Sequence, residues 1–207
     1  MKITSTALAA LAAGLMVTAA HADFTYQHIS IDTTSLVSAV TGPYSLDFSF
    51  LGNLNVSNNA TLSGFAFLGT GAGTNGAATI TGTASGDMGS TITLSTGANV
   101  FNDIYQGFTA GTTNISFNLT LSTIVDPLTP DNFTISILDG STNNIATTAN
   151  DGITLTSFAI DSFNPTTTVS ASTSPASVTV AVPEPSDYII VGLGVLALVI
   201  AYRRRQA

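Results

Sequence analysis

The stretch Asn114-Ile115-Ser116-Phe117-Asn118-Leu119-Thr120-Leu121 carries the clearest structural signal in the sequence. Every second residue is apolar, and the residues between them are Ser, Asn and Thr. A period of two places one set of side chains on each face of an extended chain. We therefore expect a β-strand with one buried face here.

The same alternation recurs on both sides of this stretch, and no segment before residue 186 keeps a helical apolar period. It is strong over residues 46–50 and 133–137, and shorter at 65–67, 92–94, 153–155 and around Tyr26. Strands spaced by about ten residues predict an all-β fold of roughly eight to eleven strands. The expected architecture is an antiparallel β-sandwich, jelly-roll-like, over residues 23–163.

Turn signals rich in Gly, Asn and Asp separate these runs. Such residues tolerate positive φ or cap a turn through the side chain, so each cluster predicts a turn between strands. The predicted turns are Thr41-Gly42-Pro43, residues 69–73, Asn75-Gly76, Ser85-Gly86-Asp87, Asp126-Pro127, Asp139-Gly140 and Asp151-Gly152.

Charge is scarce and unevenly placed along the 207 residues. The net charge is -8, and the four basic residues are Lys2 and Arg203–Arg205. Residues 23–182 hold ten Asp, no Glu and one His, so they form no Lys or Arg salt bridge of their own. This argues against nucleic acid as a partner, because phosphate binding needs clustered Lys and Arg. With no cysteine, disulfides and thiolate chemistry are also excluded.

The N-terminal segment has the pattern of a secretory signal peptide. An apolar run over residues 7–20 follows a single Lys, and the small residues Ala20 and Ala22 occupy the positions that signal peptidase reads. We expect residues 1–22 to direct export through the Sec machinery and to be removed before Asp23. A buried N-terminal helix is the alternative.

The C-terminal segment, residues 183–207, has three parts in order. A Pro-Glu-Pro motif stops any incoming strand, because proline lacks the ladder N–H. Fifteen uncharged residues then predict a single transmembrane helix, although about 22 Å of helix is shorter than roughly 30 Å of hydrocarbon. The arginine cluster is expected to hold the C-terminus in the cytoplasm. The three parts are Pro183, Glu184 and Pro185; Tyr188, Ile189, Ile190, Val191, Gly192, Leu193, Gly194, Val195, Leu196, Ala197, Leu198, Val199, Ile200, Ala201 and Tyr202; and Arg203, Arg204 and Arg205.

This order of parts resembles the PEP-CTERM sorting signal of Gram-negative bacteria. The resemblance implies export, transient anchoring in the inner membrane, and processing near the Pro-Glu-Pro motif by an exosortase, a membrane-embedded transpeptidase-like enzyme. Delivery to the cell surface or extracellular matrix would follow. A plain C-terminal membrane anchor is the alternative.

The middle of the chain also resembles a family of short secreted β-rich PEP-CTERM proteins. The likeness rests on Leu-Asp-Phe-Ser-Phe at residues 46–50 and on Phe-Asn-Asp-Ile-Tyr-Gln-Gly-Phe at residues 101–108. It implies a fold and no activity. Between this region and the sorting signal, residues 164–182 are rich in Thr, Ser and Pro, and predict either a stalk or a final edge strand through Val178, Val180 and Val182.

Few residues in the ectodomain suggest chemistry. His28 is alone, so no His-based metal cluster forms, and we expect it on a strand facing solvent or a partner hydroxyl. Asp103 is expected in a turn or bulge hydrogen bond; alternatively it and Asn102 present oxygens to Ca²⁺ or a sugar hydroxyl. No Asp-x-Asp-x-Asp-Gly loop occurs, and the other weak Ca²⁺ candidates are Asp126 with Asp131, and Asp139 with Asp151.

The sequence thus predicts a non-catalytic surface or matrix protein, without cofactor, associated with exopolysaccharide or biofilm. Its hydroxyl and amide groups suit sugar contacts, while its negative field disfavours anionic surfaces. A Ca²⁺-dependent carbohydrate-binding adhesin or lectin is the alternative. A secreted glycan hydrolase is a third option, which needs two facing carboxylates and is weakened by the absence of Trp.

Overall fold

The structure is a computed structural model that describes residues 24–36, 40, 42–122, 124, 130–149, 151–160 and 167–181. All eleven elements in these residues are β-strands, which confirms the all-β expectation. They are β1 (Phe24–Asp32), β2 (Tyr44–Leu51), β3 (Asn59–Gly69), β4 (Thr74–Thr81), β5 (Ile92–Ser95), β6 (Phe101–Phe108), β7 (Thr112–Ser122), β8 (Asp131–Leu138), β9 (Thr154–Ile160), β10 (Thr167–Ala171) and β11 (Ser177–Ala181).

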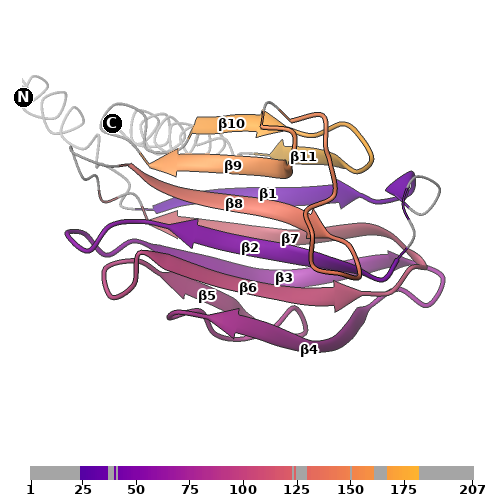
Figure 1. The fold of residues 1–207 in the computed structure, drawn as a ribbon, viewed down its shortest axis with the longest axis horizontal. Helices are drawn as coiled ribbons and strands as arrows, with labels where there is room; N and C mark the ends of the chain where they lie inside the picture. Colours follow the sequence, from indigo (N-terminus) through magenta and orange to yellow (C-terminus); the bar gives the residue numbers. More distant parts are fainter. Residues whose placement is uncertain are drawn as a thin grey trace, which may run out of the picture.

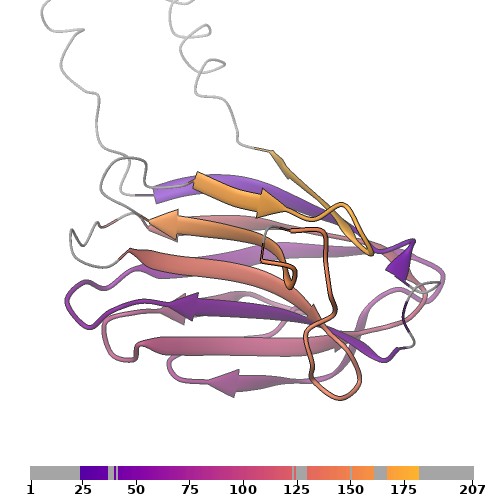
Figure 2. The ribbon, with the colours of Figure 1, turned by 45° about the horizontal axis from the view of Figure 1, so that its top comes forward.

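Two antiparallel sheets pack face to face in a β-sandwich-like arrangement (Figures 1 and 2). The first sheet has the strand order β11-β1-β7-β3-β5, and the second has the order β10-β9-β8-β2-β6-β4. The predicted strand at 114–121 is the inner part of β7, which pairs with β1 on one side and β3 on the other.

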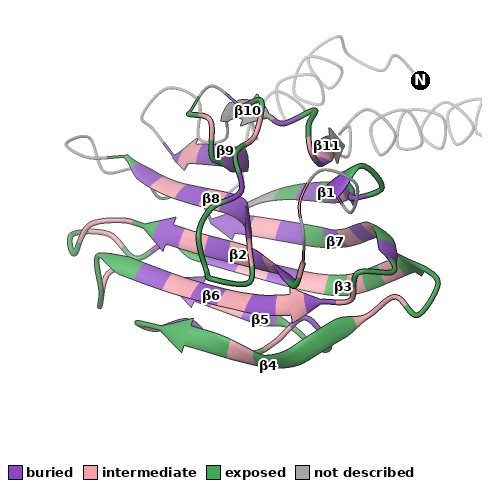
Figure 3. Ribbon diagram, turned by 45° about the vertical axis from the view of Figure 1, so that its right-hand side comes forward, coloured by how far each residue is buried: buried purple, intermediate pink, exposed green. Residues whose placement is uncertain are grey.

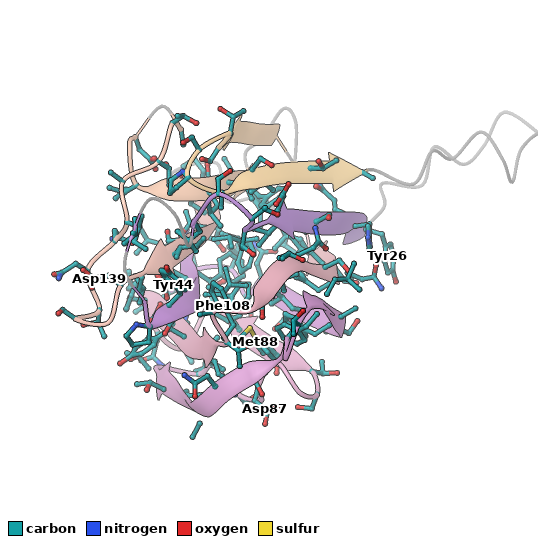
Figure 4. All side chains as sticks on the ribbon, turned by 90° about the vertical axis from the view of Figure 1, so that its right-hand side faces the viewer. Tyr26, Tyr44, Asp87, Met88, Phe108 and Asp139 are labelled. Atoms are coloured by element: carbon teal, nitrogen blue, oxygen red, sulfur yellow. The ribbon has the colours of Figure 1, made fainter. Side chains whose placement is uncertain are left out.

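The core between the sheets is aliphatic and aromatic. Along β2 and β7 buried and less buried residues alternate, as the burial colouring shows (Figure 3). Phe48 of the second sheet meets Phe117 of the first edge to face, with ring centroids 5.6 Å apart. Tyr44 stacks on Phe108 at 5.7 Å inside the molecule (Figure 4). Fully burying a Leu, Ile or Phe side chain contributes about 1.5–3 kcal/mol, so this core is the main source of stability.

One predicted turn is wrong. Asn75-Gly76 lies inside β4, where Gly76 has a φ of 79° and the register shifts between Asn75 and Thr79. β4 is an edge strand of its sheet and pairs only with β6, so a bulge there disrupts a single ladder. A positive-φ glycine can therefore mark a bulge as well as a turn.

The Thr/Ser-rich segment is built into the two sheets. Of residues 164–182, those from 167 to 181 form β10, which pairs with β9, and β11, which pairs with β1. Val178 and Val180 of β11 pack against the core. The described part of this segment thus forms an edge strand on each sheet, and none of it is a free stalk.

The chain enters and leaves the sandwich at one end, which we call the entry end. β1 starts opposite Ser122, the last residue of β7, and β11 runs antiparallel to β1 and ends at Ala181, opposite His28. The β2–β3 and β5–β6 loops lie at the same end, and the β1–β2, β6–β7 and β8–β9 loops lie at the far end (Figure 1).

Candidate functional site: a polar groove with a carboxyl pair

The outer face of the second sheet carries polar side chains. In β2, Leu46, Phe48 and Phe50 face the core, so Asp47 and Ser49 face outward. The strand register then places Ser136 beside Asp47 and Thr134 beside Ser49 on β8. On the other side, Ser49 lies opposite Asp103 of β6.

A groove of about 330 Å³ lies on this face, and we call it the outer groove. Strands β2 and β8 supply much of its lining. The rest comes from the β8–β9 loop, which crosses the sheet in Figure 1, and from the first residues of β6 and β9. The volume falls within the range of small-molecule sites. The lining residues are Asp47, Ser49, Leu51, Phe101, Asn132, Thr134, Ser136, Asn144, Asp151, Ile153 and Thr154.

Two carboxyl groups meet beneath this groove. Asp47 is hydrogen-bonded to Asp103 on the neighbouring strand, and the Ser49 hydroxyl donates to Asp103 Oδ1 at 2.6 Å. Burial raises the pKa of Asp47 to about 8, helped by the hydrogen bond with Asp103 and by the negative charge of Asp103; the hydrogen bond with Ser49 opposes this rise. At neutral pH the Asp47 carboxyl therefore keeps its proton.

Two oxygen atoms in the groove lining are buried and have no hydrogen-bond partner. They are Asp47 Oδ1 and Asn132 Oδ1. Leaving such an atom unpaired costs about 1–3 kcal/mol, and most buried polar atoms in native proteins are paired. Two further unpaired atoms, Gln27 Oε1 and Thr156 Oγ1, belong to residues outside the groove lining.

The structure corrects the expected position of Asp103. It lies in the middle of β6 and not in a turn or bulge. Its neighbour Asn102 points to the opposite face, where it is fully buried and accepts hydrogen bonds from the Thr83 N–H at 2.8 Å and the Thr83 hydroxyl at 2.7 Å. The two residues therefore cannot present their oxygens to one ligand.

The other Ca²⁺ candidates serve local structure where they are described. Asp131 is 2% exposed and holds loops together, as set out below. Hydrogen bonds from Asn143 and Ser141 hold the pKa of Asp139 below its usual value. Burial opposes ionisation of Asp151, but hydrogen bonds from Thr154 and Ile153 outweigh it and lower the pKa. Asp126 lies outside the described residues, and within them no three acidic or imidazole side chains are placed to hold a metal.

His28 lies on β1 of the first sheet, away from the groove lining. It is exposed, and its Nδ1 is 3.0 Å from Asn118 Oδ1 on β7. His28 therefore faces solvent from a strand, as predicted, and its hydrogen-bond partner is an amide and not a hydroxyl.

The targeting residues lie outside the described part of the chain. This holds for Ala20, Ala22 and Asp23, for Pro183–Pro185, and for residues 188–205. Among the described residues, no helix has the length and apolar character needed to cross a bilayer.

The pairing of Asp47 with Asp103 was not predicted from the sequence. Both stand inside alternating strand patterns, whereas many other aspartates neighbour Gly, Pro or Asn in turn signals. Their position within strands, and not in turns, was the sequence feature that could have singled out these two aspartates. Their contact depends on the register between β2 and β6, which neither strand encodes alone.

Comparisons with protein-family models, with curated proteins and with solved structures found no match. The site is therefore interpreted from its own geometry.

Proposed function

We propose that this protein is an exported, exosortase-sorted surface or matrix protein whose sandwich, jelly-roll-like in topology, binds extracellular polysaccharide without catalysis. The observation that supports binding is the pair of buried, unpartnered oxygens, Asp47 Oδ1 and Asn132 Oδ1, in the outer groove. The export and sorting parts rest on the sequence of the two chain ends.

The groove suits the hydroxyl groups of a neutral sugar. The hydroxyl groups of Ser49, Thr134 and Ser136 line the groove and can exchange hydrogen bonds with sugar hydroxyls, while the proton of Asp47 stays within the carboxyl pair. Ile153 of the β8–β9 loop adds apolar surface at the lining, against which the C–H face of a sugar ring can pack. An anionic polysaccharide is disfavoured, because no Lys or Arg occurs between residues 3 and 202.

Binding is tested by affinity electrophoresis of the full chain through gels containing neutral or acidic exopolysaccharide. Asn132→Ala is expected to weaken retention by neutral polysaccharide about tenfold, the equivalent of one lost hydrogen bond of about 1.4 kcal/mol. Asn118→Ala on the opposite sheet is the matched control. Equal retention of the two variants would argue against the groove as the binding site.

The same gels distinguish the proposed function from the Ca²⁺-dependent alternative. We expect retention to be unchanged when EDTA replaces Ca²⁺, since no described cluster of acids is placed to hold a metal. Retention that requires Ca²⁺ would favour an adhesin or lectin over the proposed function.

A glycan hydrolase is the second candidate, favoured by the two carboxyl groups beside the groove. Its mechanisms need carboxyl groups about 5–9.5 Å apart, with a sugar or water between them. Asp47 and Asp103 are hydrogen-bonded to each other, which leaves no room for either. Asp151, the other acid in the lining, accepts hydrogen bonds from Ile153 and Thr154 through both of its oxygens. Incubation with polysaccharide should therefore release no reducing ends, and release that Asp47→Asn abolishes would establish the enzyme instead.

Sorting is tested in cells with and without the exosortase. Uncleaved, membrane-bound chain should accumulate only where the enzyme is missing. The same mass and location in both strains would contradict the sorting proposal and leave the groove proposal standing.

A further inference from the structure

Large apolar side chains gather on the surface at the entry end. Leu51 ends β2, Leu54 lies in the β2–β3 loop, Val100 and Phe101 lie where β6 begins, and Ile124 follows β7. Each is about half exposed, from 48% for Phe101 to 60% for Leu54. We call these five residues the apolar end patch. Exposed apolar residues are usually scattered singly, so a cluster of this size indicates an interaction surface.

Part of the patch surrounds a hollow of about 420 Å³. Leu51, Leu54, Val100 and Pro130 contribute to its lining. The hollow draws on the β2–β3, β5–β6 and β7–β8 loops, so the patch is assembled from separate parts of the chain.

A buried polar network holds these loops in place. Asp131 Oδ2 accepts hydrogen bonds from Asn58 Nδ2 and the Thr96 hydroxyl, both at 2.9 Å, and Asp131 Oδ1 accepts one from the Asn53 N–H at 3.2 Å. Asn58 Oδ1 in turn accepts from the Ile124 N–H at 2.8 Å. We call this network the loop brace. The loop brace holds the loop backbones in place. The exposure of the patch is therefore a defined feature of the fold and does not result from loose packing.

The loops beside the patch lack charged side chains. Residues 52–58 and 96–100, which form two loops of the entry end, contain no charged side chain. The far end carries Asp32, Asp139 and Asp151. Figure 4, viewed from the far end, shows Asp139 projecting from the periphery. The two loops that contribute Leu54 and Val100 to the patch are therefore uncharged.

The chain leaves the sandwich from β11 toward this apolar end. Six residues, 182–187, separate Ala181 from the apolar run that begins at Tyr188. Six residues span at most about 20 Å when extended. If residues 188–202 cross a bilayer, as the proposed function requires, the apolar end patch is held within reach of that bilayer.

We propose that the apolar end patch docks on the lipid bilayer, with its side chains in the boundary between headgroups and acyl chains. The choice of a bilayer as the occupant rests on the membrane tether of the proposed function. Since the tether supplies a high effective concentration, even a small apolar contact area is enough for docking. A docked sandwich keeps the Pro183–Pro185 motif close to the membrane surface, where a membrane-embedded enzyme can reach it.

The test uses a single tryptophan, since the chain has none. Leu54→Trp reports on the patch, and Leu68→Trp is the matched control, because Leu54 and Leu68 are 60% and 61% exposed and lie at opposite ends of the sandwich. The full chain is reconstituted into phosphatidylcholine vesicles with brominated acyl chains. At an insertion depth of about 5–10 Å, we expect roughly twofold or greater quenching at position 54 and none at position 68.

Val100→Trp gives a second reporter in the patch and is expected to be quenched like Leu54→Trp. Resistance of the vesicle-bound chain to carbonate extraction reports on the tether separately. A chain that resists extraction but shows no quenching at positions 54 and 100 overturns docking alone. A chain that is extracted and not quenched overturns docking and the tether together, and one that is extracted yet quenched at position 54 supports docking without the tether.

Two further outcomes overturn the proposal. Equal quenching at positions 54 and 68 means that the sandwich does not dock through this end. A blue shift at position 54 that appears without lipid and grows with protein concentration means that a second copy of the chain covers the patch.

Discussion

Asp131 and Asp47 are both largely buried, but their carboxyl groups differ in how completely they are hydrogen-bonded. Asp131, in the loop brace, has both oxygens engaged by donors from Asn53, Asn58 and Thr96. Asp47, in the outer groove, shares a hydrogen bond with another carboxyl group and leaves Oδ1 without a partner. A carboxyl group whose oxygens are all hydrogen-bonded stabilises the structure, whereas one with an oxygen left unpaired retains capacity for a ligand.

The largest effect on stability is predicted for removal of the Asp131 carboxyl group, both oxygens of which are hydrogen-bonded. Asp131→Ala leaves Asn58 Nδ2 and the Thr96 hydroxyl without their acceptor, which should lower the free energy of unfolding by about 3–4 kcal/mol. Urea unfolding of the full chain measures this, with Asp87→Ala in the β4–β5 loop as the control. A loss no greater than that of the control would contradict the structural role of the loop brace.

The next largest effect is a pH dependence of the unfolding free energy that arises from the titration of Asp47. Its pKa is about 8 in the folded protein and near 3.8 when unperturbed, so the folded state binds more protons between these values. Stability should therefore fall as the pH rises from 4 to 8, by on the order of a few kcal/mol.

Asp47→Asn removes this titration. Its unfolding free energy should vary much less over the same pH range, because an amide cannot lose a proton there. Unfolding midpoints at several pH values measure the difference, with Asp87→Asn as the control. An unchanged slope in Asp47→Asn would assign the pH dependence to other groups.

A smaller effect is expected at Ser49, which supports the carboxyl pair. Ser49→Ala removes the 2.6 Å hydrogen bond to Asp103 and should cost about 1 kcal/mol. Ser45→Ala, at another outward position of β2, is the comparison for loss of a hydroxyl. Equal stability of the two variants would show that the Ser49 hydrogen bond contributes nothing.

The smallest stability effect is predicted at Asn132. Its Oδ1 is buried without a partner, so Asn132→Ala removes an unpaired polar atom and should not lower the unfolding free energy, while it weakens polysaccharide binding. Thermal unfolding beside the binding assay makes the comparison. A large loss of stability would mean that Asn132 is structural, as Asp131 is.

The alternation of apolar residues predicted most of the strands, because one buried face imposes a period of two, but it did not predict β4 or β10. It also counted Tyr26 and Ile153 among the buried-face residues, and both are exposed. The alternation correctly predicted which side chains of β2 and β7 face the core. It failed at Asn75-Gly76, since a glycine with positive φ fits an edge-strand bulge as well as a turn. The sequence also left residues 164–182 open, because Thr and Ser suit a stalk and an exposed edge equally.

The carboxyl pair was harder to predict than the fold. Asp47 and Asp103 are 56 positions apart in the numbering, and their contact exists only in one register of β2 against β6. Single-strand patterns do not specify which residues face each other across a ladder. The same limit applies to the apolar end patch, whose members come from several loops.

The most direct test of the account is a titration of the Asp47 carboxyl carbon by NMR, with and without neutral polysaccharide. The resonance is assigned by its loss in Asp47→Asn. The account predicts a midpoint near pH 8 in the free protein, which sugar binding shifts by more than about half a unit. A midpoint near pH 4, or one that the polysaccharide leaves unchanged, would contradict it.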